Sequence, residues 1–492
     1  RSSRGLGDVY KRQVLAEERG FKELANKNPK MRGLLKEQNA LKYQRSIFTS
    51  AIQKAEEEKS MADVVRLKKR LSELDEQSQL LEQSIRRLFP AYRMQADSKI
   101  GGDVRKRLKE KLIRRDAQLL SYFVGEDEVY SIIGTPANFH FSKVSKRSFD
   151  DKTAHFLKEL SNPLNSKPEQ FAQSGKQLFD LLIGEKVASL GSNWVILPDG
   201  VLNSLPFEAL VTKTGSNVSS FRKLSYLLND HVIHYAPSAY FVAQERVGEK
   251  AEKSFLGMAP VFTDSKEYDF LPKSREELQA GVSLFSGVDF TEEKATKNRF
   301  FKEAELYDIL HISTHAGRNS GNNNDAWMAF SDVHSKDHRM TANELLQLDL
   351  AASLVVLNAC ETGSGTVFNG EGPMSLARGF LDAGSQSTVT NLWSVSHESN
   401  AAIMKSFYEN MQENQSPSKS LSKAKLAYLA SSEIDDASAH PYYWSSAILI
   451  GTDISVTGPD SSMSMWIWGM LGATLIVILG ATIYRRRKRK MA

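Results

Sequence analysis

The chain has 492 residues, of which 41% are hydrophobic and 25% are charged, and its formal net charge is +5. That length exceeds what one hydrophobic core usually supports and indicates two to four structural units. A single cysteine, Cys360, excludes an internal disulfide framework and a multi-cysteine zinc site. Residues 485–490 carry six positive charges, and residues 1–13 carry a net charge of +3. Because these charges exceed the total of +5, the rest of the chain is mildly acidic. No basic footprint of a nucleic-acid-binding protein is visible in it.

Residues 1–13 begin with arginine and match neither a repeat nor a targeting signal. They resemble translated adaptor sequence of the kind found at the ends of metagenomic fragments, so we treat them as a non-native leader. We expect the true N-terminus, with a signal peptide or upstream repeats, to lie outside this sequence.

Residues 14–113 are predicted to form a helical connection. Apolar residues in it recur at alternating spacings of three and four, which is a heptad seam broken only at Ser78. The seam positions are Val64, Leu67, Leu71, Leu74, Leu81, Ile85 and Leu88. An earlier helix over residues 34–55 is expected to pack against this one as an antiparallel hairpin. The pattern indicates a coiled-coil spacer or a partner-docking arm without chemistry of its own.

Residues 114–453 alternate apolar runs with amphipathic stretches. Residues 118–135 are typical of two strands joined by a Gly-Glu-Asp turn. Further strand-like runs are 193–200, 231–238, 254–260, 307–315, 353–360, 386–393 and 445–451. The alternation predicts a three-layer α/β domain with a largely parallel sheet. In such domains, reactive groups lie beyond the carboxyl ends of the strands.

The C-terminal residues predict a membrane anchor. After a polar linker, 454–464, residues 465–484 form an uncharged stretch bounded by tryptophans and a tyrosine. Twenty helical residues span the roughly 30 Å hydrocarbon core of a bilayer. The basic tail 485–492 follows, and the positive-inside rule places it in the cytoplasm. We therefore expect one transmembrane helix, with the larger domain on the extracytoplasmic side.

Cys360 follows one strand-like run, and His315, 45 residues earlier, follows another. A thiol needs an adjacent imidazole to become a good nucleophile at neutral pH. The glycine at 317 lets a backbone N–H approach a substrate carbonyl, and with the Cys360 N–H it would form an oxyanion hole. On these residues alone, Cys360 is either a catalytic nucleophile or a buried structural thiol.

Other candidate sites are weaker. His311 lies four residues before His315 on a strand, with no glutamate after it, so a zinc-protease helix is not indicated and a core histidine is expected. The glycines of residues 363–373 lack the Gly-Lys-Ser/Thr ending of a phosphate loop. We therefore predict neither a metal nor a cofactor.

Seven blocks in order resemble the CHAT domain, a caspase-like cysteine peptidase family similar to separases and gingipains and often fused to tetratricopeptide repeats. The blocks lie at 196–210, 234–241, 310–317, 340–350, 354–365, 370–395 and 440–451, and the resemblance covers roughly 115–453. It implies a caspase-like αβα sandwich, a His315–Cys360 dyad, and an upstream repeat array to which residues 14–95 would connect.

One departure from the family pattern concerns substrate preference. Family members commonly carry an aspartate in LW-x-V-x-D, placed to help hold a basic substrate side chain, and here His397 occupies that position. Glu398 or Asp382 would have to substitute for the missing charge, so a preference for Arg or Lys is in doubt. Trp393 is either packing or pocket floor, and His440 is expected to be structural.

Taken together, the sequence predicts a membrane-anchored caspase-like cysteine endopeptidase that cleaves a protein substrate. A regulatory protein is expected to act through the N-terminal helices. The alternative is a catalytically silent scaffold that retains the fold for protein–protein interaction.

Overall fold

The computed structural model of the chain describes most of residues 29–456. The described ranges are 29–88, 100–135, 138–185, 190–215, 218–243, 251–262, 268–271, 273–318, 326–331, 338–358, 366–368, 372–374, 376–393 and 396–456. Within them, no helix is both long enough and apolar enough to cross a membrane. The predicted membrane helix, residues 465–484, lies outside the described residues.

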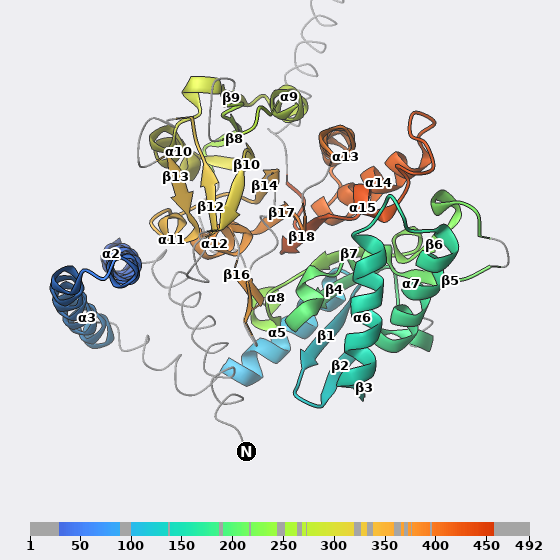
Figure 1. The fold of residues 1–492 in the computed structure, drawn as a ribbon, viewed down its shortest axis with the longest axis horizontal. Helices are drawn as coiled ribbons and strands as arrows, with labels where there is room; N and C mark the ends of the chain where they lie inside the picture. The colour runs from blue at the N-terminus through green and yellow to red at the C-terminus, as the bar shows by residue number, and fades with distance from the viewer. Residues whose placement is uncertain are drawn as a thin grey trace, which may run out of the picture.

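An eleven-stranded sheet forms the centre of the α/β domain, in the order β3-β2-β1-β4-β7-β18-β17-β14-β10-β8-β9 (Figure 1). In chain order its strands are β1 (Ala117–Val124), β2 (Glu128–Gly134), β3 (Phe139–Ser145), β4 (Asn193–Leu197), β7 (Val232–Tyr235), β8 (Lys253–Ala259), β9 (Val288–Thr291), β10 (Tyr307–Ser313), β14 (Leu354–Asn358), β17 (Ser387–Asn391) and β18 (Ala447–Gly451). Seven of the ten neighbouring pairs are parallel, and the antiparallel pairs are β1–β2, β2–β3 and β17–β18. The predicted mixed α/β fold with a largely parallel sheet is therefore confirmed.

Helices cover both faces of this sheet, because successive residues of each buried strand point to opposite sides. In β10, Ile309 packs into one core while Leu310 and Ile312 pack into another. The first face is covered by α6 (Lys146–Leu160), α7 (Pro168–Leu182), α9 (Ser274–Leu284), α13 (His397–Gln412), α14 (Pro417–Ala430) and α15 (Pro441–Trp444). The second is covered by α5 (Ile100–Arg114), α8 (Ala239–Ala243), α10 (Lys297–Glu303), α11 (Ala342–Leu345) and α12 (Leu376–Ala383).

Short strands and 3₁₀ turns lie in the segments that connect the larger elements. A three-stranded sheet joins β11 (Ala316–Arg318), β12 (Ala326–Ala329) and β13 (Arg339–Thr341) directly after β10. Two-stranded pairs are β5 (Val211–Lys213) with β6 (Ser225–Tyr226), and β15 (Thr366–Phe368) with β16 (Gly372–Met374). Short 3₁₀ turns are η2 (Gly200–Ser204), η3 (Phe207–Ala209), η4 (Phe221–Lys223), η5 (Leu227–Asn229), η6 (Glu292–Lys294) and η7 (Ala304–Leu306).

The N-terminal helices α2 (Pro29–Glu57) and α3 (Met61–Leu88) form a hairpin, which we call the helical arm. Ion pairs join the two helices, from Arg45 to Asp75 at 2.7 Å and from Lys68 to Glu56 at 2.8 Å. Every seam position of α3 up to Leu81 is buried or half-buried, as the heptad pattern predicts; the described seam positions are Val64, Leu67, Leu71, Leu74, Ser78 and Leu81. The arm lies beside α11 (Figure 1).

Two elements differ from what the sequence suggests. The hairpin of β1 and β2 carries a third strand, β3, whose Phe139 and Phe141 are exposed, so no buried apolar alternation announces it. Helix α5 lies in the stretch expected to be a connection, yet it packs against β1 and α8 and buries Leu112.

Candidate active site

Strands β10 and β14, which precede the two predicted catalytic residues, end side by side. The strands are parallel, Ser313 pairs with Asn358, and the Thr314 N–H donates to the Asn358 carbonyl at 3.1 Å. His315 follows Ser313 by two residues, and Cys360 follows Asn358 by two residues. Cys360 itself lies outside the described residues. The structure therefore brings together the ends of the two strands that precede the predicted catalytic residues, and the His315–Cys360 dyad stays a prediction.

A backbone carbonyl and two aromatic rings hold His315. Its Nε2 lies 2.8 Å from the carbonyl oxygen of Asp269, and its ring stacks on Tyr268 with centroids 5.5 Å apart and planes 20° apart. The Phe262 ring lies 5.2 Å away. Because a carbonyl oxygen only accepts hydrogen bonds, Nε2 must carry a proton. In the neutral ring, Nδ1 is then the nitrogen that can accept a proton from a substrate or a thiol.

The Tyr268 ring that supports His315 is itself held by polar contacts. The Arg339 Nε donates to the Tyr268 oxygen at 2.8 Å, and the same oxygen lies 2.8 Å from Nε2 of His338. The Arg339 guanidinium also lies 4.0 Å from the centroid of the Trp327 ring. Trp327 lies in β12 and Arg339 in β13. The small sheet after β10 thus supports the Tyr268 ring and, through it, His315.

Gly317 lies in β11 opposite Trp327 of β12. A Cβ atom at this position would lie 2.7 Å from Cζ2 of Trp327, which is closer than carbon atoms approach without displacement. Close packing on the indole is therefore a reason for glycine that the sequence did not reveal. The proposed role of its N–H in an oxyanion hole stays a prediction.

Sequence reasoning missed Glu277, which lies in α9 directly behind the two strand ends. Its side chain is buried, with the residue 2% exposed, and its Oε2 accepts hydrogen bonds from Ser313 Oγ at 2.8 Å and from Asn358 Nδ2. Its Oε1 accepts a long hydrogen bond from Asn400 Nδ2 at 3.4 Å. Burial raises the pKa of Glu277 to about 7, against the opposing effect of these hydrogen bonds. In the sequence, Glu277 cannot be distinguished from the other charged residues of an amphipathic helix.

The four residues predicted for a substrate pocket lie in two places. Trp393, His397 and Glu398 follow the carboxyl end of β17, so they share the edge of the sheet with His315. The Trp393 indole donates to the Tyr442 carbonyl at 3.0 Å and lies partly buried against the core, whereas His397 and Glu398 are exposed. Asp382 lies at the end of α12, which leads into the amino end of β17, and it pairs with Arg378 at 3.6 Å. The structure does not gather Asp382 with the other three.

The two remaining histidines of the prediction are structural. His311 is fully buried in β10, its Nδ1 lies 2.8 Å from the Tyr408 hydroxyl, and burial lowers its pKa to about 3. His440 is also fully buried, and its Nδ1 accepts from the Tyr442 N–H at the start of α15. Both therefore stay neutral near pH 7, as expected of core histidines.

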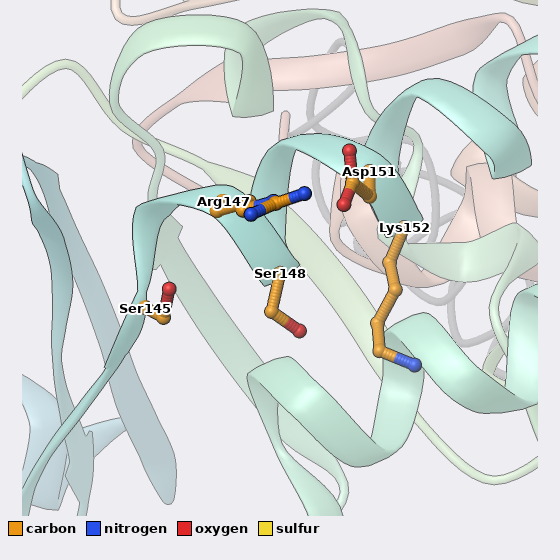
Figure 2. Close-up of a pocket in the computed structure, with 5 residues that line it drawn as sticks. All are labelled: Ser145, Arg147, Ser148, Asp151 and Lys152. Carbon is orange, nitrogen blue, oxygen red and sulfur yellow. The ribbon is translucent and has the colours of Figure 1, made fainter.

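The described part of the chain holds no group of three or more His, Cys, Asp or Glu side chains that would bind a metal ion. A hollow at the start of α6 is lined by Ser145, Arg147, Ser148, Asp151 and Lys152 (Figure 2). It lies next to β3, near the opposite end of the sheet order from β10, and is therefore separate from the candidate active site.

Comparison with known proteins gives one family and a few distant relatives. The family model described as the CHAT domain matches residues 172–452. Tetratricopeptide repeat protein 28 of Mus musculus is 26% identical over 224 residues, covering 39% of this chain and 9% of that protein. The Homo sapiens protein of that name is 30% identical over 122 residues, covering 25% of this chain and 5% of that protein. The chain thus spans less than a tenth of the length of these curated relatives.

Two solved structures resemble this fold at low identity. The Saccharomyces cerevisiae separase–securin complex matches with 13% identity and a TM-score of 0.38, over 85% of this chain and 28% of that chain. The complex of pro- and mature domains of RgpB from Porphyromonas gingivalis matches with 10% identity and a TM-score of 0.35, over 63% of this chain and 76% of that chain. Both values are too low to carry an inference about function.

Proposed function

The chain belongs to the CHAT domain family, and on that basis we propose that it is a caspase-like cysteine endopeptidase with a His315–Cys360 dyad. The observation that supports this most directly is the pairing of Ser313 with Asn358, which starts both segments from one sheet edge. A supporting contact is the Asp269 carbonyl, which fixes the ring tautomer in which Nδ1 can act as a base.

The proposed reaction is acyl transfer to the cysteine followed by hydrolysis. Nδ1 of His315 takes the thiol proton, and the thiolate forms a bond to the carbonyl carbon of the scissile peptide. The oxyanion is stabilised by backbone N–H groups of Gly317 and Cys360. The imidazolium then protonates the leaving amine as the C–N bond breaks. Water, deprotonated by His315, hydrolyses the thioester and restores the thiol.

Single substitutions test this proposal on a peptide library with the full chain. Cys360→Ala and His315→Ala should each abolish cleavage while the melting temperature stays within a few degrees of wild type. His155→Ala is the matched control, because His155 is an exposed histidine on α6, far from β10 in the sheet order. Retention of wild-type turnover by Cys360→Ser would refute the assignment of the nucleophile.

A second candidate function is a docking module without catalysis. It is favoured by the curated relatives, which are named for tetratricopeptide repeats, and by the helical arm, which is itself a helix pair. Because Cys360 is the only cysteine, a thiol-reactive probe reports on it alone. Fast labelling of native protein that is lost in His315→Ala favours the enzyme, whereas labelling at the rate of a free thiol favours the docking module.

Regulation through the helical arm is part of the proposal. The Tyr43 hydroxyl of α2 donates to Glu344 Oε1 of α11 at 3.0 Å, and the same oxygen pairs with Lys297 at 2.7 Å, where both partners are buried. The Lys297 ammonium also donates to the Arg339 carbonyl at 2.8 Å. The Arg339 side chain in turn donates to Tyr268, the ring on which His315 stacks. A protein that binds the arm would thus act on a continuous series of contacts to the histidine.

Tyr43→Phe tests this regulatory connection, because it removes one hydroxyl and keeps the ring. We expect a changed cleavage rate with an unchanged melting temperature. Arg45→Gln is the control, since Arg45 lies on the same helix and pairs with Asp75 inside the arm. Equal cleavage rates for wild type and Tyr43→Phe, with and without a bound partner, would refute the connection.

Membrane anchoring by residues 465–484 also belongs to the proposal, with the catalytic domain on the extracytoplasmic side. It is supported by the uncharged length and the basic tail that follows. Extraction of membranes with alkaline carbonate should leave the full chain in the pellet, and recovery in the supernatant would refute anchoring.

A further inference from the structure

Glu277 joins three separate elements through one buried carboxylate. It accepts from Ser313 at the end of β10, from Asn358 at the end of β14, and from Asn400 on α13. Helices α9 and α13 lie against each other on this face of the sheet (Figure 1). The two strand ends that carry the proposed dyad are thus fastened to the same side chain.

The network continues across the next strands. Asn391 Nδ2 at the end of β17 donates to Asn358 Oδ1 at 3.1 Å, and Ser446 Oγ just before β18 donates to Asn391 Oδ1 at 3.2 Å. Each residue therefore accepts from the one beyond it, and the series ends at Glu277. Because every contact to Glu277 comes from a donor, the network fits an ionised carboxylate.

A buried carboxylate without a cation is costly for a fold, and its presence calls for a reason beyond packing. Among the described residues, no lysine, arginine or histidine forms an ion pair with Glu277. The ionisable groups that interact with its charge are Glu276 on α9 and Tyr408 on α13, and neither is a cation. Lys273, just before α9, interacts with Glu276 and with Glu398 of α13, and burial keeps His311 of β10 neutral. Lys273 pairs with Glu276, which leaves the charge of Glu277 stabilised by hydrogen bonds alone.

We propose that Glu277 is a positioning residue of the dyad, whose ionised carboxylate fixes the ends of β10 and β14, the two strands from which the chain continues to His315 and to Cys360. This inference rests on the proposed function. Glu277 touches neither the thiol nor the substrate and acts through Ser313 and Asn358. When the carboxylate is protonated or replaced by an amide, Ser313 and Asn358 donate to a neutral oxygen instead of a charged one, so the two strand ends are held less tightly. Burial raises the pKa of Glu277 to about 7, so this change of charge falls near neutral pH.

The rate at which iodoacetamide alkylates the single cysteine measures how strongly His315 activates the thiol, and it requires no peptide substrate. The pseudo-first-order rate is recorded against pH for wild type, Glu277→Gln, Glu276→Gln and His315→Ala. Glu277→Gln should lower the rate near neutral pH about tenfold and displace the pH profile, because fewer thiols then contact the imidazole. Glu276→Gln is the matched control, an exposed glutamate one residue away on the same helix; its charge is the last of the causes that act on the pKa of Glu277, so it should displace the profile much less than Glu277→Gln.

The outcomes separate this inference from the proposed function. If His315→Ala slows alkylation but the Glu277→Gln profile superimposes on wild type, the positioning role is wrong and the dyad stands. If His315→Ala has no effect, the dyad and the positioning role both fail. Should Glu277→Gln fail to fold, Ser313→Ala decides the question, since it removes one donor to the carboxylate. It should displace the profile in the same direction, and an unchanged profile would overturn the inference.

Discussion

Replacing Glu277 by glutamine should change how the stability of this protein depends on pH. In the folded chain the pKa of Glu277 is raised to about 7 from an ordinary value of 4.5, chiefly because burial disfavours the charged form. A carboxyl group whose folded pKa is raised holds its proton more tightly in the folded state. Its contribution to stability is therefore fully present below pH 4.5 and is lost as the pH rises through 7.

The magnitude follows from the size of the pKa shift. The difference between 7 and 4.5 corresponds to about 3 kcal/mol at 1.36 kcal/mol per pKa unit. Between about pH 5 and about pH 8, most of it, about 2.5 kcal/mol, should be lost from wild type and retained by Glu277→Gln. Glutamine also presents an amide N–H to donors of the network, which lowers stability at every pH but does not alter the slope.

Urea unfolding at a series of pH values measures this effect as a difference between wild type and variant. The difference is needed because His234, His311 and His440 have pKa values lowered by burial and act in the opposite direction below pH 6.5. Glu276→Gln, which removes only the last of the causes that act on the pKa of Glu277, should stay much closer to the wild-type curve than Glu277→Gln does. Parallel curves for wild type and Glu277→Gln over this pH range would show that Glu277 is not held with a raised pKa, and the reasoning from its burial would be refuted.

Three further substitutions have expected outcomes in stability measurements. Lys425→Met should destabilise the chain by about 3–5 kcal/mol in urea unfolding, because it leaves Glu208, its buried partner at 3.1 Å, without a cation; a loss below about 1 kcal/mol would contradict this. Gly317→Ala should cost about 1–3 kcal/mol, since the new methyl group meets the Trp327 ring, and an unchanged melting temperature would contradict the clash. His440→Asn keeps a hydrogen-bond acceptor at the start of α15. It removes a group whose pKa is lowered to about 4 by burial. The variant should therefore lose less stability than wild type as the pH falls from 6.5 to 4. An acid limb identical to wild type would contradict the last prediction.

Much of the fold follows from the sequence because buried parallel strands have a strong local signature. All seven apolar runs from residue 193 onward correspond to strands of the central sheet, and the hairpin before them is also present. The small sheet of β11, β12 and β13 is not predictable in this way, because strands of three or four residues contain too few positions to show alternation. Strand β3 is not predictable for a related reason. Its phenylalanines are exposed, so its sequence does not show which face of the strand is buried.

In the candidate site, too, some features have a local signature in the sequence and others do not. The ends of β10 and β14 are predictable because each strand is recognisable in the sequence, and the carboxyl ends of parallel strands lie on one edge of the sheet. The groups that hold them are not predictable, because they depend on tertiary packing. Glu277 becomes buried only when α13 packs on α9, and the Asp269 carbonyl reaches His315 from a loop 46 residues earlier. Neither contact leaves a periodic pattern in a single sequence.

The boundary of β10 separates two histidines with opposite properties. His311, inside the strand, is fully buried against Tyr408, and its lowered pKa keeps it neutral and unsuited to accepting a proton at neutral pH. His315 lies just past the strand end and is half-buried, with Nε2 bonded to the Asp269 carbonyl. That carbonyl accepts a hydrogen bond from Nε2 in both the neutral and the protonated ring, so the imidazole can gain and lose a proton at Nδ1 without losing its support. Two histidines four residues apart thus differ in burial, one inside the core and one past the strand end, and the difference lies in where the strand ends.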